Sequence, residues 1–596
     1  MSHAPAFVPR PYERLTDGRR AGRKTLTEAS RSRRSGRLEL TWTNKDWRLL
    51  DPEGDGDWSW DWVPPSDYRV AEVRLLREAG GIGEPGSGNL LIRGDALHAL
   101  GSLTRLPGYS EHHLGQVKLA YLDPPFSSSQ WSRYYDEAVE HSYWLTLMRD
   151  RLEQVRELLA PDGSVWVHCD DYEQAHLKVL MDELFGRSSF VATIVWERRY
   201  TQSSDATISL THDYLLIYAS DPRVWKTARN PLPRTEKQDK AYKNPDNDPR
   251  GPWKAASLIS PNYRRSGDFL IIAPNGRQHR PPEGTSWRYP RETYDALLTD
   301  NRIWWGTDGN NTPAVKTFLS QVAGVVPKTW WPHEDAGHTD LATREMKALF
   351  PGVAPFATAK PEKLIERVIH IGSDPGDLVL DPFLGSGTTA AVAHKMGRRW
   401  VGVERSRDTV ETYAAPRLRK VVEGSDPGGI TDVVDWEGGG GFRVLDVRPS
   451  MFEDDEGQVV LADWATNGML AEATAAQLGF AYEPDPPLSG RKGRTRLAVI
   501  DGHVSGAVVG LLVDALDEGE LLTVCGTSVD PQAVDELRTL RPSSRVRKIP
   551  DSLLAEYQET HRWRPRSVEA PRPDWTPVAA TATAEPAQEA TEEVPS

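Results

Sequence analysis

One segment constrains the fold of this chain more than any other: residues 377–404, which read DLVLDPFLGSGTTAAVAHKMGRRWVGVE. An apolar run ends in an aspartate, a loop with two glycines follows, and an alanine-rich stretch leads into a second apolar run. This order predicts a buried strand, a tight loop, a helix and another strand. Such units place their strands side by side in one direction, so the segment predicts a parallel sheet covered by helices.

The same alternation precedes this segment. Residues 89–100 predict a strand, a turn and the start of a helix, and residues 116–126 predict an apolar strand that ends in a loop. Residues 143–163 carry apolar side chains at helical spacing, and residues 164–171 predict another strand. We therefore expect an α/β fold with a mostly parallel, doubly wound sheet. Ligands bind at the carboxyl ends of such strands, so the loops after residues 122 and 381 should share one crevice.

The glycine loop, Asp381 to Thr389, is suited to holding a ligand. Gly385 and Gly387 permit positive φ and close approach, and the following helix offers free N–H groups. Glu404 ends the next strand, where an acid can bind ribose hydroxyls. The loop lacks the third glycine of a dinucleotide site and the lysine of a P-loop, which favours an adenosyl cofactor without phosphates. A tight turn with an incidental acid is the alternative.

The loop YLDPPF, Tyr121 to Phe126, combines three features that methylation of a base amine requires. Asp123 and the Pro124 carbonyl can accept the amine protons, and the two prolines stiffen the turn. Phe126 offers a face on which an extruded base could stack. The alternative is that Asp-Pro-Pro is ordinary turn chemistry and that Phe126 belongs to the core.

Together, DPPF and FLGSG resemble the two motifs of DNA amino-methyltransferases that use S-adenosylmethionine. The catalytic motif comes first here, which is the order of the β group of that family. The resemblance implies a methyltransferase-type sheet with an inserted target-recognition region and a small C-terminal α/β domain. It implies a catalytic role for Asp123, Pro124, Pro125 and Phe126. It implies cofactor binding by Asp95, Lys360, Pro361, Asp381, Phe383, Gly385, Gly387, Thr388 and Glu404.

Two further stretches, residues 211–219 and 244–253, resemble modification subunits of type III restriction–modification systems. The aspartate that leads the DPPF motif favours adenine N6 as the target. We expect a sequence-specific methyltransferase acting on double-stranded DNA. The chain shows no helicase or nuclease motif, so cleavage would need a separate helicase–nuclease restriction subunit or other defence-complex subunits. Cytosine-N4 methylation, an RNA substrate, or a specificity subunit within a larger defence complex remain alternatives.

Composition excludes several other classes. The chain has two cysteines, Cys169 and Cys525, which excludes a disulfide framework and a cysteine-rich zinc site. We expect no metal, no membrane span and no signal peptide, and hence a cytoplasmic protein. The net charge of -14 is concentrated after residue 420, where 31 acidic residues face 15 basic ones. Residues 190–350 instead hold 22 basic and 18 acidic residues, so the overall sign does not argue against DNA binding there.

The middle region is the predicted site of sequence reading. It contains eight tryptophans interleaved with arginines that include Arg198, Arg199, Arg264, Arg265, Arg277 and Arg280. The alternative is a mixed-charge surface over an aromatic core. His168, on the strand of residues 164–171, is predicted to be a satisfied core residue without a chemical role.

The acidic C-terminal domain suits dimerisation, giving a homodimer, or docking of a protein partner, and a stabilising appendage is the alternative. For the basic N-terminal tail, an arm that contacts phosphates is the alternative to a solvated tail. We predict six regions in all. The predicted regions are a disordered basic tail (1–38), the catalytic half (39–190), the target-recognition region (191–350), the cofactor-binding half (351–420), the C-terminal domain (421–567) and a disordered tail (568–596).

Overall fold

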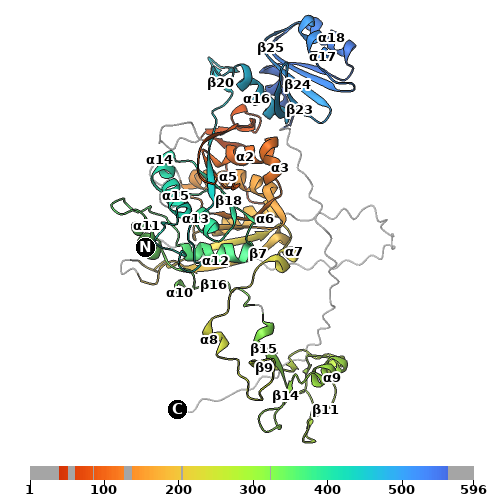
Figure 1. The fold of residues 1–596 in the computed structure, drawn as a ribbon. Helices are drawn as coiled ribbons and strands as arrows, with labels where there is room; N and C mark the ends of the chain where they lie inside the picture. Colours follow the sequence, from red (N-terminus) through yellow and green to blue (C-terminus); the bar gives the residue numbers. More distant parts are fainter. Residues whose placement is uncertain are drawn as a thin grey trace, which may run out of the picture.

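The computed structural model describes residues 39–50, 61–84, 86–125, 137–202, 206–322 and 324–560. Both predicted disordered tails lie outside these ranges, as does Phe126. Figure 1 shows a central body with one unit extending from each end of it. No helix in the described ranges is long and apolar enough to cross a membrane.

A ten-stranded sheet forms the centre of the molecule. Its strands, from one edge to the other, are β16 (Trp330–Trp331), β7 (Phe190–Glu197), β8 (His212–Ala219), β6 (Leu159–Cys169), β5 (Val117–Leu122), β17 (Leu378–Asp381), β18 (Arg399–Glu404), β4 (Leu90–Arg93), β19 (Gly441–Val447) and β3 (Leu76–Gly83).

The strands from β6 to β19 in this order run parallel to one another. Within this sheet β8 and β3 run against them, while β7 and β16 again share the common direction. The expectation of a mostly parallel sheet is therefore confirmed. The order also places β5 beside β17, although about 255 residues separate their loops in the sequence.

Helices cover both faces of the sheet, which makes it doubly wound. One face packs against α2 (Ala96–Arg105), α5 (Glu137–Leu158) and α6 (Gln174–Phe185). The other face packs against α7 (Pro222–Ala228), α12 (Glu362–Gly372), α13 (Thr388–Lys395) and α15 (Ala415–Val422).

Successive strand residues alternate between the two cores, as the pleat of a strand requires. In β5, Ala120 and Leu122 join the first core, whereas Leu119 and Tyr121 join the second. This explains why the central strands are apolar at nearly every position.

The segment between β8 and β16 leaves the sheet and forms a small lobe, seen at the bottom of Figure 1. Its core lies around a three-stranded sheet and one helix. The elements are α8 (Glu236–Asp239), β9 (Trp253–Ser257), β10 (Ile259–Ser260), β11 (Ile271–Ile272), β12 (Gln278–His279), β13 (Ser286–Trp287), α9 (Arg291–Thr299), β14 (Ile303–Trp304) and β15 (Ala314–Phe318).

The lobe is narrower than the region predicted for target recognition. β7, β8 and β16 fall within residues 190–350 but belong to the central sheet. Two short helices, α10 (His333–Ala336) and α11 (Thr339–Leu349), then lead the chain back toward α12. The sequence does not show that β7, β8 and β16 belong to the central sheet, because these strands, which flank the lobe, pair with their neighbours only in the folded protein.

The C-terminal unit begins after β19, which itself completes the central sheet beside β4. It is an α/β unit, as expected, with three parallel strands at one side of its five-stranded sheet. Its elements are β20 (Phe452–Asp455), β21 (Gln458–Leu461), α16 (Asn467–Leu478), β22 (Ala481–Asp485), β23 (Leu488–Lys492), β24 (Thr495–Val504), α17 (Gly506–Asp514), β25 (Leu521–Val529), α18 (Pro531–Leu540), β26 (Arg545–Lys548) and α19 (Asp551–Thr560).

Five further strands and α-helices lie in the first half of the chain or directly after β18. They are β1 (Arg48–Leu50), β2 (Asp61–Val63), α1 (Tyr68–Ala71), α3 (Pro107–His113) and α14 (Arg407–Thr409).

Candidate active site

A pocket of about 370 Å³ lies at the carboxyl ends of β5 and β17. From β5 the chain passes through α5 to β6, whereas from β17 it passes through α13 to β18 on the opposite side. The connections therefore diverge between these two strands, which is where open α/β sheets bind ligands. Residues of both loops line the pocket, including Asp123 and Gly385, so the predicted shared crevice is confirmed.

The glycine loop depends on backbone conformations that other residues rarely adopt. Gly385 has a φ of 53° and Gly387 a φ of 82°. A Cβ atom on Gly385 would lie 3.3 Å from the Phe356 ring, and one on Gly387 would lie 3.3 Å from the Ala414 backbone. The glycines are thus required by both torsion and space, and Gly387 sits directly before the start of α13.

Glu404 holds the glycine loop from the neighbouring strand. Its Oε2 accepts a hydrogen bond of 2.8 Å from the Gly385 N–H, and its Oε1 accepts one of 2.8 Å from the Ser406 N–H. Each carboxylate oxygen retains a second lone pair for a ligand. Burial raises the pKa of Glu404 above its usual range, although these backbone donors oppose the effect.

Asp381 is the most buried acid of the pocket. Burial raises the pKa of Asp381 to about 7, opposed by hydrogen bonds from Thr389 and the Phe383 N–H. The neighbouring carboxylates of Asp123 and Glu404 raise it further. A cluster of acids in one enclosed space favours a cationic ligand, because such a ligand relieves their mutual repulsion.

The Asp-Pro-Pro loop is held in place by two contacts. The Lys360 Nζ donates to Asp123 Oδ2 at 2.5 Å, and both side chains are largely buried. The Trp144 indole donates to the Pro125 carbonyl at 2.8 Å. Lys360, predicted to bind cofactor, lines the pocket but here contacts the predicted catalytic aspartate. Phe126, the predicted stacking residue, lies outside the described residues.

Asp95 also lines the pocket and caps the start of α2. Its Oδ1 accepts from the Leu97 N–H at 2.6 Å, and both its oxygens accept from Arg151 Nη2 at 2.8 Å. Burial alone would raise the pKa of Asp95, but the Arg151 guanidinium outweighs it and the pKa is lowered. Asp95 is therefore a fixed anion that can accept a ligand N–H.

Arg151 is a pocket residue that the sequence motifs did not indicate. It lies on α5, next to Leu152 and three positions after Met148, both of which are buried. The sequence did offer one indication of its role. An arginine among the buried positions of an amphipathic helix requires a partner for its charge.

Arg417 connects the starts of α12 and α13, the two helices that follow Lys360 and the glycine loop. This arginine is 1% exposed; its Nη1 donates to the Thr388 hydroxyl at 2.7 Å and its Nη2 to Glu362 Oε1 at 2.8 Å. Lys395 also pairs with Glu362, at 2.8 Å. Thr388 begins α13 and Glu362 begins α12, so one buried network fixes the starts of both helices.

Two predicted cofactor residues support the pocket without lining it. Pro361 precedes the first residue of α12 and packs near Gly337, and Gly387 faces Ala414. The other predicted residues among those described, including Phe383 and Thr388, line the pocket.

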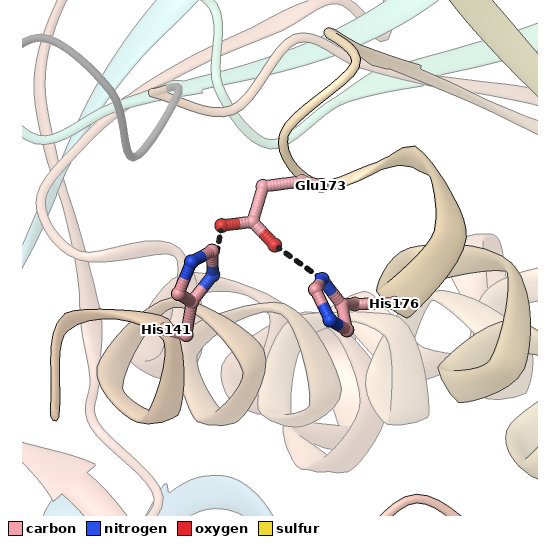
Figure 2. Close-up of side chains that lie close together, drawn as sticks. All are labelled: His141, Glu173 and His176. Atoms are coloured by element: carbon pink, nitrogen blue, oxygen red, sulfur yellow. Dashed lines mark ion pairs between the residues drawn. The ribbon is translucent and has the colours of Figure 1, made fainter. Parts of the chain in front are cut away.

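A second polar cluster joins the starts of α5 and α6 (Figure 2). The Glu173 carboxylate lies between two imidazoles, 2.8 Å from His141 Nδ1 and 3.7 Å from His176 Nδ1. These side chains are of types that bind zinc. Here the carboxylate is paired with the imidazoles, and we interpret the cluster as a link between the two helices.

The middle region separates its aromatic from its basic residues. Six of the eight tryptophans predicted to accompany DNA contacts are buried, so an aromatic core is the correct interpretation for them. They are Trp196, Trp225, Trp253, Trp287, Trp305 and Trp331. Arg199, Arg264, Arg265, Arg277 and Arg280 are exposed, whereas Arg198 is half-buried and pairs with Asp213.

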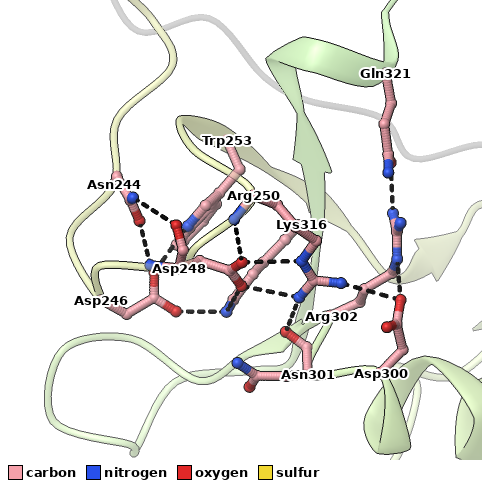
Figure 3. Close-up of polar contacts among 10 residues, drawn as sticks. All are labelled: Asn244, Asp246, Asp248, Arg250, Trp253, Asp300, Asn301, Arg302, Lys316 and Gln321. Carbon is pink, nitrogen blue, oxygen red and sulfur yellow. Dashed lines mark hydrogen bonds and ion pairs between the residues drawn. The ribbon is translucent and has the colours of Figure 1, made fainter.

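A network of charged side chains supports the lobe (Figure 3). Lys316 on β15 pairs with Asp246 and, at 3.1 Å, with Asp248. Arg250 extends the network to Asp300 at 3.1 Å. The stretch of residues 244–253, which resembles type III subunits, thus anchors the lobe internally.

Comparison with known proteins agrees with this geometry. Residues 117–415, about half of the chain, match a family described as DNA methylase, and this range contains both pocket loops. The chain is 30% identical over 336 residues to the StyLTI Mod subunit, a type III restriction-modification enzyme of Salmonella typhimurium. The match covers 51% of this chain and 49% of that protein.

Two other proteins are similar to parts of this chain. The type II methyltransferase M.EcaI of Enterobacter cloacae is 30% identical over 308 residues, covering 50% of this chain and 64% of that protein. The PvuII cytosine-N4-specific DNA methyltransferase aligns at 16% identity over 62% of this chain and 94% of that one, with a TM-score of 0.31. The chain spans about half to two thirds of the length of the curated relatives it matches.

The family match spans half of the chain and includes both loops at the divergence of the sheet. This chain belongs to the DNA methylase family.

Proposed function

We propose that this chain transfers a methyl group from S-adenosylmethionine to the N6 amine of adenine in double-stranded DNA. The observation that carries the proposal is that the Asp-Pro-Pro loop and the glycine loop line the same pocket. With these loops as the amine acceptor site and the nucleoside cofactor site, the two reactants would lie next to each other, and positioning of two reactants is the main requirement of such a transfer.

The acids of the pocket fit the charges of the proposed cofactor. S-adenosylmethionine supplies an activated methyl group on a sulfonium and also carries an ammonium, both cationic. Asp381 and Glu404 provide the negative field, and the start of α13 offers N–H groups to a carboxylate. Glu404 would hold ribose hydroxyls through its remaining lone pairs, and Asp95 would accept from the adenine edge. The supporting residues are Lys360, Pro361, Phe383, Gly385, Gly387 and Thr388.

The Asp-Pro-Pro loop would hold the target amine. Lys360 occupies Asp123 Oδ2, so Oδ1 is the oxygen directed to the amine. The Pro124 carbonyl is the second acceptor, because the next carbonyl, that of Pro125, is already bonded to Trp144. Two acceptors draw the amine protons out of the ring plane and free the nitrogen lone pair for attack. Phe126 would stack on the extruded base.

Adenine is the proposed base because the motif begins with Asp123. The relatives named as type III Mod subunits support this assignment and a place in restriction–modification or another phage-defence system. In that setting, the chain would read DNA in the cytoplasm through the lobe and act with a helicase–nuclease subunit. The acidic C-terminal unit, poorly suited to DNA, would form a homodimer or contact a protein partner.

Methyl transfer to duplex DNA by the purified chain tests the proposal. Labelled S-adenosylmethionine should transfer its methyl group to DNA, and mass spectrometry of the nucleosides should find N6-methyladenine. N4-methylcytosine would show the alternative base specificity, and competition by RNA would show a different substrate.

The Asp123→Ala variant supplies the residue-level test. It should lose methylation while cofactor binding, measured by calorimetry, survives. Asp535→Ala, an exposed aspartate of α18, is the matched control and should retain full activity. Full activity in Asp123→Ala would contradict the assignment of the loop.

A further inference from the structure

A chain of three buried side chains leads away from the pocket across neighbouring strands. Tyr121 lines the pocket, and its hydroxyl lies 3.3 Å from His168 Nδ1. His168 Nε2 lies 3.2 Å from Asp213 Oδ2, and Asp213 Oδ1 lies 3.1 Å from the Arg198 Nε. Tyr121 is 1% exposed, His168 0% and Asp213 3%, whereas Arg198 reaches the surface.

Strand register brings these side chains together. Tyr121 on β5 pairs with Trp166 on β6, so His168 lies two residues further along the same face. His168 is opposite Leu215 on β8, and Asp213 precedes that residue by two positions. Side chains two apart share a face of the sheet. Asp123 likewise follows Tyr121 by two residues, at the rim of the same face.

The aspartate determines the tautomer of His168. A carboxylate can only accept, so His168 Nε2 carries the proton and donates it to Asp213. Nδ1 of the neutral ring is then an acceptor, and the Tyr121 hydroxyl is its donor. This is the arrangement in which a buried acid orients an imidazole to take a proton from a hydroxyl group.

We propose that Tyr121, His168 and Asp213 remove the proton that the target amine must lose on methylation. The inference rests on the proposed function. When the nitrogen–carbon bond forms and the sulfur–carbon bond breaks, the N6 nitrogen holds one proton too many. Tyr121 accepts that proton as its own hydroxyl proton passes to His168 Nδ1. The imidazolium that results is stabilised by Asp213, and the hydroxyl is restored in the same step.

The surrounding charges fit this direction of transfer. Burial raises the pKa of Tyr121 well above its usual range, and the carboxylates of Asp123, Asp381 and Asp213 add to the effect. The tyrosine therefore conducts a proton as a neutral hydroxyl. Burial would raise the pKa of Asp213, but the hydrogen bond from His168 and the charges of Arg198 and Lys360 lower it. Asp213 thus stays anionic.

Single-turnover methylation at saturating cofactor, compared in water and in deuterium oxide, tests this role. Tyr121→Phe removes only the hydroxyl, and we expect its rate to fall by roughly 100-fold, the range of general acid–base effects. In the wild type, the rate should fall in deuterium oxide because proton transfer accompanies methyl transfer. In His168→Gln this solvent isotope effect should shrink. Asp213→Asn should slow the reaction because an amide cannot fix the tautomer.

Tyr218→Phe is the matched control. Tyr218 is also fully buried in the same sheet, and its hydroxyl donates to Asp182 at 2.7 Å, away from the pocket. A merely structural role of Tyr121 would give the two variants equal rates and unchanged solvent isotope effects. Equal rates in these variants, with cofactor affinity intact, would overturn the inference while leaving the proposed methyltransferase function standing.

Nitrogen NMR of labelled histidine gives a readout that does not depend on turnover. The His168 signals, assigned by their loss in His168→Gln, should show a protonated Nε2 and an unprotonated Nδ1. A proton on Nδ1 would exclude transfer from Tyr121 and overturn the inference. If the wild type methylates no nucleic acid, the proposed function fails and the proton-transfer role falls with it.

Discussion

The pocket and the lobe use charged side chains in different ways. Around the pocket, charges such as Arg417 and Glu362 are buried between helices that pack on a large sheet. In the lobe, Lys316 and Asp248 are comparably enclosed, but their network extends outward to the exposed Asp300. The pocket therefore has positions fixed by extensive packing, whereas the lobe has a small core with basic residues on its surface.

This difference matches the two tasks proposed for the chain. Group transfer requires reacting atoms to be held within fractions of an ångström, which a packed sheet provides. Reading DNA requires exposed donors, because phosphates and base edges must reach them. Variants of the pocket should therefore alter cofactor binding, and variants of the lobe should alter DNA binding.

The largest effect is expected for Gly387→Val. L residues rarely adopt its φ of 82°, and a Cβ atom there would lie 3.3 Å from the Ala414 backbone, a tight contact to which valine adds two methyl groups. Cofactor affinity should fall by roughly 10- to 100-fold, corresponding to the strain of such a position. Calorimetry would measure it. Gly276→Val in the lobe has a similar φ of 83° and open space, so cofactor affinity should be unchanged there.

Cofactor binding should also depend on pH through Asp381. Its pKa of about 7 without ligand means that it carries a proton in acidic solution. A cationic cofactor favours the carboxylate, so binding releases this proton and affinity rises with pH, by up to about tenfold per unit below that pKa. Asp381→Asn should remove the dependence. Affinity that stays constant between about pH 5 and 8 in the wild type would contradict the proposal.

Lys316→Met should affect the lobe selectively. The substitution leaves Asp246 and Asp248 facing each other without their shared cation, which destabilises a buried charged network. We expect DNA affinity to fall by about tenfold and proteases to cleave the lobe faster, with cofactor binding retained. A parallel decrease in cofactor affinity would show that the two regions are not independent.

The smallest effect is expected for Arg264→Ala and Arg265→Ala on the lobe surface. Each should weaken DNA binding a fewfold and reduce the slope of log affinity against log salt by about 0.9 for each phosphate that the protein no longer neutralises. Fluorescence anisotropy at several salt concentrations measures this slope. Arg538→Ala, an exposed arginine of the C-terminal unit, should leave it unchanged.

Much of the fold was predictable because its signals are local. The glycine loop and the apolar strands of residues 117–122 and 378–381 specify their own backbone, and their alternation with helices predicts a parallel sheet. Membership of β7, β8, β16 and β19 in that sheet was not predictable. A strand joins a sheet through its hydrogen-bonded neighbours, and for β16, β8 and β19 at least one of these lies far away in the sequence.

Some pocket residues were likewise predictable from local signals, and others were not. Asp123 and Gly385 were found because each belongs to a short motif with its own chemistry. Arg151 and Arg417 were missed because each acts through a partner that is remote in the sequence. The tryptophans of the middle region illustrate the converse: composition favoured a binding surface, but packing placed most of them in cores.

The two loops are encoded locally, because the positive φ of Gly385 and Gly387 and the Asp-Pro-Pro turn at Asp123 can be recognised from neighbouring residues. The pairing of Lys360 with Asp123 and the place of His168 between Tyr121 and Asp213 arise only when the chain folds. The physical reason is register: a hydrogen bond between strands or helices exists only where the sheet order and the side-chain alternation align both partners.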